Sequence, residues 1–456
     1  MRLSHTIKNE IEFGTGSGIE SMRRIEVNQS GPLRGTVKIP GSKNSSLALL
    51  AAACLGDEPV RLKGIPNILD FRVIQEMTSE IGAVMTREVN GDLVIDPRGI
   101  HTGELNVGKT SAYRASYYFI GALLAKQRQV TIGYPGGDDF VSRPIDQHLK
   151  VLRSLGASIV LHDNYYTVQT ERLLGCTIMF DVITSGATIH AILAAVLAEG
   201  ETVLRHAAKD PEVVDTAQML VAMGAKISGA GTDVIRITGV TQLGGCTYSV
   251  IPDRLIAGSF LIGAGVTGGV VTVEDVIPEH LESCLIKLRE IGMSFEINEN
   301  SITGYADQPL NAVRVRTGMY PGFATDLQQP LTSLLLLAKG RSLVTEKVYP
   351  MRFSHVPQLR RLGADIEIKS STAFIQGDRP LRGSLVHATD VRAGTCLILA
   401  GFAAEGTTII SGIEHIERGY DNVIGLFRSI GGDISLRDGT LGDIDDLNGN
   451  RIELLS

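Results

Sequence analysis

Several basic residues of this chain lie where apolar helices are expected to begin. Lys43 precedes "NSSLALLAAACL", Arg114 is placed inside the apolar helix of "YRASYYF", and Arg392 follows Asp390 in "ATDVRAGTCLILAG". The N-terminal end of a helix carries a partial positive charge, and a cation beside it strengthens the attraction for anions. Because a guanidinium group donates in a planar fork that matches carboxylate and phosphate, these positions predict a small, highly anionic substrate.

Two further basic residues strengthen this prediction. Arg352 lies in "PMRFSHVPQL" and Arg418 in "HIERGY". Taken one at a time, such an arginine is more often a structural ion-pair partner, and a segment like that of Lys43 is more often an ordinary helix cap. The basic residues recur beside the loops between repeated units, however, and this recurrence favours their convergence on one cleft.

Carboxylates accompany the same segments. Asp326 comes directly before the apolar run in "PGFATDLQQPLTSLLLL", where it either caps that helix or acts as a general base at a cleft wall. Asp138 and Asp139 follow two glycines in "YPGGDDFVSRPIDQH", and a solvated turn is the simpler interpretation of that pattern. Gly136 and Gly137 would also allow such a segment to act as the hinge of a lid.

An internal repeat supplies the elements that position these residues. Six copies of an apolar helix, a glycine turn, a β-rich strand and an amphipathic helix follow one another at intervals of 68 to 74 residues. The glycines that close them are Gly82, Gly156, Gly224, Gly292, Gly363 and Gly431. Self-similarity at a fixed period indicates a repeat architecture. Helices such as "AILAAVLAE" are apolar nearly all round, so the expected α/β fold has helices at the centre and sheets facing outward.

Three units per domain predict two similar lobes with a cleft between them. The expected division is a flexible leader at 1–21, a catalytic lobe from 22–42 and 253–456, and a second lobe at 43–252 that carries a mobile loop at 134–143. The chain would cross between the lobes near Pro252 and Asp253. Such boundaries are expected to hold within a few residues.

Composition limits the classes of function. The chain has 456 residues, of which 43% are hydrophobic and 20% charged, and its formal net charge is −7. A mildly acidic globular chain is not a general binder of nucleic acid or of membrane surfaces. Five scattered cysteines without a C-x-x-C pair argue against a disulfide framework or a structural zinc site and favour a reducing cytoplasm. The sequence shows neither an apolar run of about 18 residues nor a secretory signal, so a cytoplasmic protein is expected.

Seven segments, in this order, resemble the enolpyruvyl transferases: "PGSKNSSLALLAAACL", "YRAS", "PGGDDFVSRPIDQH", "FATDLQQP", "MRFSHVPQLRRLGA", "ATDVRAG" and "HIERGY". The resemblance runs from about Met22 to near Asp433 and includes the sixfold repeat. "SKN" and "GGDDFVSRPIDQH" are more similar to the branch that uses a UDP-sugar than to the shikimate branch. The family implies an inside-out α/β barrel of two lobes, each with three βαβαββ-type units.

The resemblance also implies an activity. Such an enzyme moves the enolpyruvyl group of phosphoenolpyruvate to the 3-hydroxyl of UDP-N-acetylglucosamine and releases phosphate, the first committed step of peptidoglycan precursor synthesis. Addition and elimination pass through a tetrahedral phospho-ketal, with no metal or organic cofactor, in a monomer or weak homo-oligomer. The reaction needs an acid for C3, a base for the hydroxyl, and cations for the phosphate and the carboxylate.

Carried over by position, the resemblance assigns these tasks to individual residues. The phosphate would be bound by Lys43, Arg114, Arg143 and Arg418, and the carboxylate by Arg352 and Arg392. The other substrate contacts would come from Asn44, Pro144, Ile145, Asp146, Gln147, Thr184, Ser185, Gly186 and Val348, with the uridine held between Arg143 and His148. Asp326 would take the hydroxyl proton and Asp138 would protonate C3. Asp390 would aid proton handling or fix Arg392.

This sequence departs from the family pattern at three positions. Asp138 stands where most members carry a cysteine, and a carboxylic acid whose pKa is raised by a closed site can deliver the same proton. Because a carboxylate is a poorer nucleophile than a thiolate toward an epoxide, we expect resistance to fosfomycin. Val182 replaces a lysine near the diphosphate, and Tyr118 replaces a frequent tryptophan after "RAS". Both of these changes lie on the acceptor side.

Two alternatives therefore stay open. One is a paralogue that transfers enolpyruvyl to another nucleotide or sugar, such as UMP, which the change at Val182 favours. The other is a non-catalytic homologue that only binds or regulates. The retained Asp326 and the surrounding cations argue against this second alternative, because a binding module does not need a general base.

Overall fold

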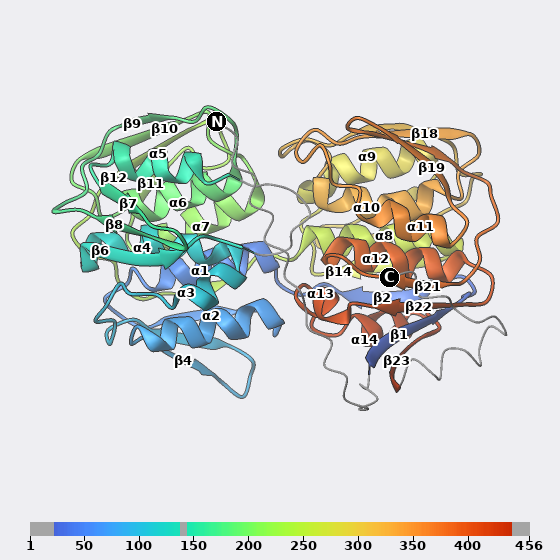
Figure 1. Ribbon diagram of the computed structural model, residues 1–456, viewed down its shortest axis with the longest axis horizontal. Coiled ribbons are helices and arrows are strands. Elements are labelled where there is room, and N and C mark those ends of the chain that lie inside the picture. Colours follow the sequence, from blue (N-terminus) through green and yellow to red (C-terminus); the bar gives the residue numbers. More distant parts are fainter. Residues whose placement is uncertain (1–21, 137–143, 440–456) are drawn as a thin grey trace.

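The computed structural model describes residues 22–136 and 144–439. These residues form two lobes that lie next to each other (Figure 1). One hydrophobic core contains buried side chains from residues 47–250, and the other contains side chains from 25–39 and 255–434. We call the first the N-terminal lobe and the second the C-terminal lobe. Since the two cores share no residue, each lobe packs around its own centre.

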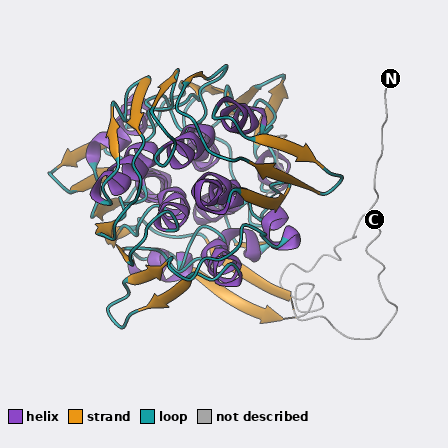
Figure 2. Cartoon of the chain, turned by 90° about the vertical axis from the view of Figure 1, so that its left-hand side faces the viewer, coloured by secondary structure: helices purple, strands orange, loops and turns teal. Residues whose placement is uncertain are grey.

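Each repeated unit has one central helix. The central helices are α1 (Lys43–Ala53), α4 (Tyr118–Gln127), α6 (Ser185–Ala195), α8 (Arg254–Thr267), α10 (Thr325–Leu335) and α12 (Val391–Ala403). They are buried on nearly all sides, and strands surround the helices in Figure 2. Their many alanine and leucine residues suit this place, because such side chains favour helix and cost little when buried. The expectation of central apolar helices is confirmed.

A second set of helices has one face buried against the core and the other exposed to solvent. These are α2 (Leu69–Glu80), α5 (Asp146–Ser154), α7 (Pro211–Ala222), α9 (Glu282–Ile291), α11 (His355–Arg361) and α14 (Val423–Ser429). The short segments α3 (Val107–Ala112), η1 (Arg114–Tyr117), η2 (Pro278–Leu281) and α13 (Ile413–Glu417) complete the helical elements. The repeated glycine follows each second helix with a φ between +91° and +121°. A residue with a Cβ adopts such a φ at a cost, which explains why this repeat is marked by glycine.

The outer layer of the N-terminal lobe consists of three sheets. Their strand orders are β13 (Thr247–Ser249), β3 (Val60–Lys63), β5 (Leu93–Asp96), β4 (Val84–Arg87); β6 (Gln129–Gly133), β8 (Tyr165–Gln169), β7 (Ser158–Leu161); and β11 (Lys226–Ser228), β12 (Val234–Thr238), β10 (Glu201–Arg205), β9 (Thr177–Met179). The two four-stranded sheets each have one parallel edge strand, β13 or β9. In the three-stranded sheet, a parallel bridge between Glu104 and Thr131 lies at the corresponding edge. The described part of this lobe therefore repeats one β-sheet pattern three times.

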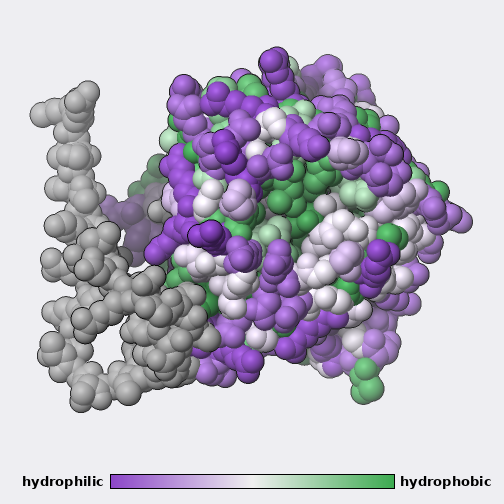
Figure 3. Space-filling model, turned by 90° about the vertical axis from the view of Figure 1, so that its right-hand side faces the viewer, coloured by the Kyte–Doolittle hydropathy of each residue, from purple (hydrophilic) through white to green (hydrophobic). Residues whose placement is uncertain are grey.

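Three further sheets enclose the C-terminal lobe. Their strand orders are β15 (Ser294–Ile297), β16 (Ser301–Tyr305), β14 (Val270–Glu274), β2 (Arg34–Lys38); β17 (Arg314–Arg316), β18 (Arg341–Thr345), β20 (Thr372–Gln376), β19 (Asp365–Lys369); and β21 (Leu385–His387), β22 (Thr407–Ser411), β1 (Met22–Asn28), β23 (Ile434–Gly439). At the outer end of this lobe, hydrophobic residues are visible in the middle and hydrophilic residues around them (Figure 3). The mixed sheets and central helices give the expected α/β fold.

Three strands are supplied from distant parts of the chain. Strand β1 pairs antiparallel with β22 and β23, β2 pairs parallel with β14, and β13 pairs parallel with β3. The chain passes between the two cores twice, and the two passages meet at a bridge between Gly41 and Pro252. There the N–H of Ser42 donates to the carbonyl of Ile251 at 2.7 Å. The two lobes are thus joined by two hydrogen-bonded segments that lie beside the cleft.

Candidate active site

A cavity of about 770 Å³ is lined by residues from both lobes. The first residues of all six central helices contribute to its wall. They are Lys43, Asn44, Tyr118, Ser185, Gly186, Arg254, Leu255, Thr325, Asp326, Val391 and Arg392. Each helix presents the positive end of its dipole at its first turn, where backbone N–H groups lack partners within the helix. The repeat therefore directs six positive helix ends at one cavity, which is suited to an anionic ligand.

The structure brings most of the predicted site residues together. The cavity wall includes Lys43, Asn44, Arg114, Pro144, Asp146, Gln147, Thr184, Ser185, Gly186, Asp326, Val348, Arg352, Asp390, Arg392 and Arg418. Ile145 instead packs against the core of the N-terminal lobe. Asp138, Asp139 and Arg143 lie outside the described residues. The individual roles given to these residues stay predictions.

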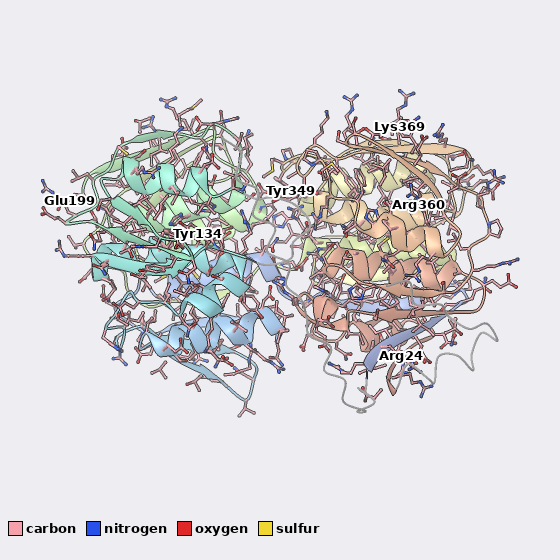
Figure 4. The ribbon with its side chains drawn as sticks, in the orientation of Figure 1. Arg24, Tyr134, Glu199, Tyr349, Arg360 and Lys369 are labelled. Atoms are coloured by element: carbon pink, nitrogen blue, oxygen red, sulfur yellow. The ribbon has the colours of Figure 1, made fainter. Side chains whose placement is uncertain are left out.

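Asp326 lies between two arginines. Its Oδ1 accepts a hydrogen bond from Nη1 of Arg352 at 2.6 Å, and its Oδ2 accepts one from Nε of Arg392 at 3.2 Å. Both arginine side chains are buried. The guanidinium of Arg352 lies 5.8 Å from the ring centre of Tyr349, which is labelled between the two lobes in Figure 4. Helix α10 has Ala324 as its N-cap, so the alternative in which Asp326 is the cap is wrong.

The two arginines control the acidity of Asp326. Burial alone raises the pKa of its carboxyl group, but the positive charges of Arg352 and Arg392 outweigh burial and hold the pKa well below its ordinary value. The carboxylate is therefore ionised at neutral pH and is a weak base while both arginines contact it. A ligand carboxylate that competes for these arginines would raise the pKa of Asp326 and strengthen it as a base.

Asp390 holds the start of α12. Its Oδ1 accepts from the backbone N–H groups of Arg392 at 2.8 Å and Ala393 at 3.1 Å. Its Oδ2 accepts from the Gln329 amide and the Ser354 hydroxyl, both at 3.3 Å. Nη1 of Arg392 is buried and has no hydrogen-bond partner within 22–136 and 144–439. Asp390 thus fixes the backbone of Arg392, while the guanidinium keeps a donor that a ligand in the cavity can use.

Arg114 lies in a different element from the one expected. The prediction of an arginine inside the apolar helix is wrong, because residues 114–117 form the 3₁₀ turn η1 and α4 begins only at Tyr118. Tyr113 is extended, with φ −132° and ψ 125°, and separates this turn from α3. The guanidinium of Arg114 lies 5.8 Å from the ring centre of Tyr117. The turn places Arg114 in the cavity wall rather than on a helix surface.

The side chains of Asp146, Gln147 and His148 in "RPIDQH" have polar partners among the described residues. The side-chain amide of Gln147 donates to Asp181 at 3.0 Å and accepts from its backbone N–H at 3.0 Å. Nδ1 of His148 lies 3.1 Å from Nδ1 of His190, and burial lowers the pKa of His148 well below its ordinary value. A neutral, buried histidine pair supports the wall of the cavity but supplies no charge there.

The loop before α6 forms a narrow part of the cavity wall. Thr184 is the N-cap of α6, and a Cβ at Gly186 would lie only 2.6 Å from the hydroxyl of Tyr117. A side chain at position 186 would therefore collide with the tyrosine. Val182, at the position where a lysine was expected from the family, lines the cavity and is more than half exposed. At this position the cavity wall thus has the apolar side chain of Val182 and no lysine.

Sequence analysis missed Asp70. Its Oδ2 lies 2.7 Å from Nζ of Lys43, and its Oδ1 accepts from Nε of Arg418 at 2.8 Å. The residue is buried and lines the cavity. In the sequence it is one acidic residue in the first turn of a helix, which is common because it complements the helix dipole. Nothing in the neighbouring sequence distinguished Asp70 from an ordinary acidic residue at the start of a helix.

Sequence analysis also missed a group of charged residues at the same cavity. Arg254 of the C-terminal lobe places Nη2 at 3.8 Å from both Asp210 and Glu212 of the N-terminal lobe. Its guanidinium lies 5.4 Å from the ring centre of Tyr320. Asp210 is the N-cap of α7 and precedes Pro211, but its side chain makes no capping bond. Burial raises the pKa of Glu212 to about 7 and also raises that of Asp210.

The elevated pKa of Glu212 predicts a pH-dependent stability. The pKa of an unfolded glutamate is about 4.3, so between that value and about 7 the folded state binds a proton that the unfolded state lacks. The folded state therefore keeps its full stability at low pH, where the buried carboxyl group is neutral, and it loses stability as the pH rises to about 7 and the group becomes charged. We expect Glu212→Gln to raise the melting temperature by about 2–4 °C at pH 8 and to leave it unchanged at pH 5.

The matched control is Glu201→Gln, which removes an exposed carboxylate of the same lobe that lies 3.7 Å from Arg236. Thermal unfolding of the three proteins at both pH values is the measurement. An equal gain for Glu212→Gln at pH 5 and pH 8 would show that the effect is not linked to a proton.

Comparison with known proteins identifies the class to which this fold and cavity belong. The family model described as EPSP synthase (3-phosphoshikimate 1-carboxyvinyltransferase) matches residues 27–426. The chain belongs to this family of enolpyruvyl transferases. Among solved structures, the enolpyruvyl transferase NikO from Streptomyces tendae superposes with a TM-score of 0.84 over 92% of this chain and 100% of that one. At 24% identity this likeness concerns the fold alone, and it confirms the expected architecture.

Within the family, the chain is similar to proteins of one kind. It is 45% identical over 414 residues to UDP-N-acetylglucosamine 1-carboxyvinyltransferase 2 of Bacillus subtilis, which covers 91% of this chain and 96% of that protein. It is 44% identical over 414 residues to UDP-N-acetylglucosamine 1-carboxyvinyltransferase of Clostridium botulinum, with 91% and 99% covered. None of the helices within the described ranges has the length and apolar character that a bilayer crossing requires.

Proposed function

We propose that this chain transfers the enolpyruvyl group of phosphoenolpyruvate to the 3-hydroxyl of UDP-N-acetylglucosamine. The observation that carries the proposal is the cavity lined by both lobes, where six helix N-termini and cations of both lobes face one space and Asp326 lies between two arginines. A dianionic phosphate and a carboxylate on one small molecule match this arrangement. The similarity to two carboxyvinyltransferases over most of their length supports the same acceptor.

Phosphoenolpyruvate would bind with its two charged ends on different cations. Its phosphate would contact Lys43 and Arg418, whose side chains extend from opposite lobes, and its carboxylate would contact Arg352 and Arg392. Arg392 has a buried donor that finds no partner among the described residues, and this donor suits an incoming carboxylate. Binding of the ligand across both lobes would favour their approach and exclude water from the reaction.

Binding of the carboxylate would also activate the base. Arg352 and Arg392 hold the pKa of Asp326 low while they contact it, and the substrate carboxylate would share their charge. The pKa of Asp326 would then rise toward the range in which it accepts the proton of the sugar hydroxyl. The substrate itself would thereby prepare the base, so that proton removal coincides with attack of the hydroxyl oxygen on C2.

The chemistry needs one further proton and one leaving group. As the hydroxyl oxygen bonds to C2, C3 takes up a proton, which we assign to the carboxylic acid of Asp138. The resulting phospho-ketal then loses a proton from C3 as the bond between C2 and the phosphate oxygen breaks. Phosphate leaves with the electron pair of the bond to C2. The electron pair of the broken C3–H bond forms the double bond between C2 and C3 of the sugar ether. The cations stabilise the charge of the departing phosphate.

The acceptor is tested by comparing three hydroxyl donors. Phosphate release from phosphoenolpyruvate is measured with UDP-N-acetylglucosamine, UMP and shikimate 3-phosphate, and we expect the highest kcat/KM with UDP-N-acetylglucosamine. A higher value with UMP would make the chain a paralogue with another acceptor, in line with Val182. Absence of turnover with all three would favour a non-catalytic homologue. Either of these outcomes would contradict the proposal.

The cellular role follows from the acceptor. Enolpyruvyl transfer to UDP-N-acetylglucosamine begins the assembly of peptidoglycan precursors, so the enzyme would serve cell-wall growth, cell shape and division. It would act in the cytoplasm as a monomer or weak homo-oligomer, without metal or organic cofactor. With Asp138 at the position of the usual thiol, it would resist fosfomycin.

A further inference from the structure

Asp70 connects two cations that come from different lobes. Its Oδ2 lies 2.7 Å from Nζ of Lys43, which begins α1 of the N-terminal lobe. Its Oδ1 lies 2.8 Å from Nε of Arg418, which follows α13 of the C-terminal lobe. All three residues line the cavity, and their side chains are between 6% and 17% exposed. One carboxylate therefore sets the positions of two cations on opposite sides of the cleft.

Asp70 divides its two carboxylate oxygens between the two cations. Each carboxylate oxygen contacts one cation, rather than both oxygens contacting one guanidinium in a fork. The ammonium group of Lys43 has three N–H donors and the guanidinium of Arg418 has five, so neither is saturated by one oxygen. The guanidinium of Arg418 also lies 5.2 Å from the ring centre of Tyr113, which supports it from another side. The contacts with Asp70 thus take up only part of the donor capacity of each cation.

The carboxylate itself has little freedom to move. Asp70 lies in the first turn of α2, next to Phe71, which is 2% exposed and belongs to the core of the N-terminal lobe. Its side chain has two rotatable bonds, whereas lysine and arginine each have at least four and lose much more rotamer freedom when they are ordered. A short carboxylate on an anchored helix is therefore the fixed member of this group, and the two long cations are the members that it orders.

We propose that Asp70 is a positioning residue for the phosphate-binding cations: it stays in place and holds Lys43 and Arg418 at a fixed separation for the phosphate of phosphoenolpyruvate. This inference rests on the proposed function, because it names the ligand of that same site. Without Asp70, two long and mutually repelling cations would separate, and their ordering would have to accompany substrate binding. Preorganised cations bind an anion more tightly because this cost is met before the ligand arrives.

An opposite role for Asp70 makes an opposite prediction. If the carboxylate were an internal substitute for phosphate, which the substrate must displace, its removal would free the cations and lower the KM for phosphoenolpyruvate. The positioning role predicts a higher KM. Asp70→Asn separates the two, because an asparagine amide keeps one acceptor oxygen but turns an N–H donor toward one of the cations.

We expect Asp70→Asn to raise the KM for phosphoenolpyruvate by about 10-fold to 100-fold, as for the loss of a charge-assisted hydrogen bond. The KM for the sugar nucleotide should stay within about twofold of the wild type, because the ion pairs of Asp70 among the described residues are with Lys43 and Arg418. The matched control is Asp57→Asn, which removes a carboxylate that lies 2.9 Å from Lys126 in the same lobe. The control should leave both KM values unchanged.

Asp70→Glu provides a second variant. It keeps the charge on a longer side chain, so its KM for phosphoenolpyruvate should lie between those of the wild type and of Asp70→Asn. A lower KM for Asp70→Asn, an equal rise of both KM values, or equal effects of Asn and Glu would overturn the positioning role. Absence of turnover in the wild type would instead count against the proposed function, and the midpoint of phosphoenolpyruvate protection against thermal unfolding would still test Asp70.

Discussion

Asp326→Asn is expected to lower kcat by about 10²-fold to 10⁴-fold, the usual contribution of a general base. The amide cannot take the proton of the sugar hydroxyl, although it keeps nearly the same volume. The KM for phosphoenolpyruvate should not rise, because Arg352 and Arg392 lose a competing partner and remain available to the substrate carboxylate. A large loss of kcat together with an unchanged or lower KM is therefore the result that identifies a base.

The control for this variant is Asp365→Asn, an exposed position on strand β19 of the same lobe, which should behave as the wild type. Steady-state kinetics with both substrates varied is the measurement, and thermal unfolding verifies that each variant is folded. If Asp326→Asn raised the KM for phosphoenolpyruvate and left kcat intact, Asp326 would act in organising the arginines and not as the base.

Asp138→Ala is expected to cause a loss of similar size, about 10²-fold to 10⁴-fold in kcat, because alanine cannot protonate C3. Asp138→Cys should retain turnover and should become sensitive to fosfomycin, since a thiolate attacks the epoxide much faster than a carboxylate does. These positions lie outside the described residues, so the expectation comes from the sequence and from the family. Residual activity and the mass of the treated protein are the two measurements.

The neighbouring carboxylate offers the matched control for this pair. Asp139 is expected to be a solvated turn residue, so Asp139→Ala should keep the wild-type rate. Full activity of Asp138→Ala would remove Asp138 from the mechanism. A time-dependent fosfomycin adduct on the wild-type protein within residues 134–143 would contradict the expected resistance.

The repeat was the part of the fold that the sequence predicted best. The glycine after each second helix needs a positive φ, and this local requirement is written directly into the sequence at every unit. The sequence did not predict the strands that distant parts of the chain supply to a sheet. Strand β1 completes a sheet with β22 and β23, which lie at the other end of the chain, and no local pattern reports such a distant partner.

The candidate site shows the same division between local and distant information. The sequence indicated that Arg114 and Asp326 belong to the site, but it did not give the exact start of the helices near them. Extended Tyr113 places Arg114 in a 3₁₀ turn, and the N-cap of the helix that carries Asp326 is Ala324. Asp70 was missed because its two partners come from segments that only the fold brings together. Glu212 was missed because its elevated pKa arises from burial in the cavity wall, which sequence does not show.

The positions of Lys43, Arg254 and Arg392 have one structural explanation, because each lies in the first turn of a central helix. Arg114, Arg352 and Arg418 reach the same cavity from other elements. Each central helix begins at the cleft, so equivalent positions of successive repeats face the same cavity from six directions. A charged residue that looked like an isolated helix cap in the sequence lies in the wall of a shared cavity in the structure. The recurrence of these residues, rather than the type of any one of them, therefore carried the correct prediction.

The most direct test of the central claim is to identify the product. The purified full-length protein is incubated with phosphoenolpyruvate and UDP-N-acetylglucosamine, and the products are analysed by mass spectrometry and NMR. One phosphate is expected for each enolpyruvyl ether formed, with the new bond at the 3-oxygen of the sugar. Phosphate released without a sugar ether, or an enolpyruvyl group found on a different acceptor only, would contradict it.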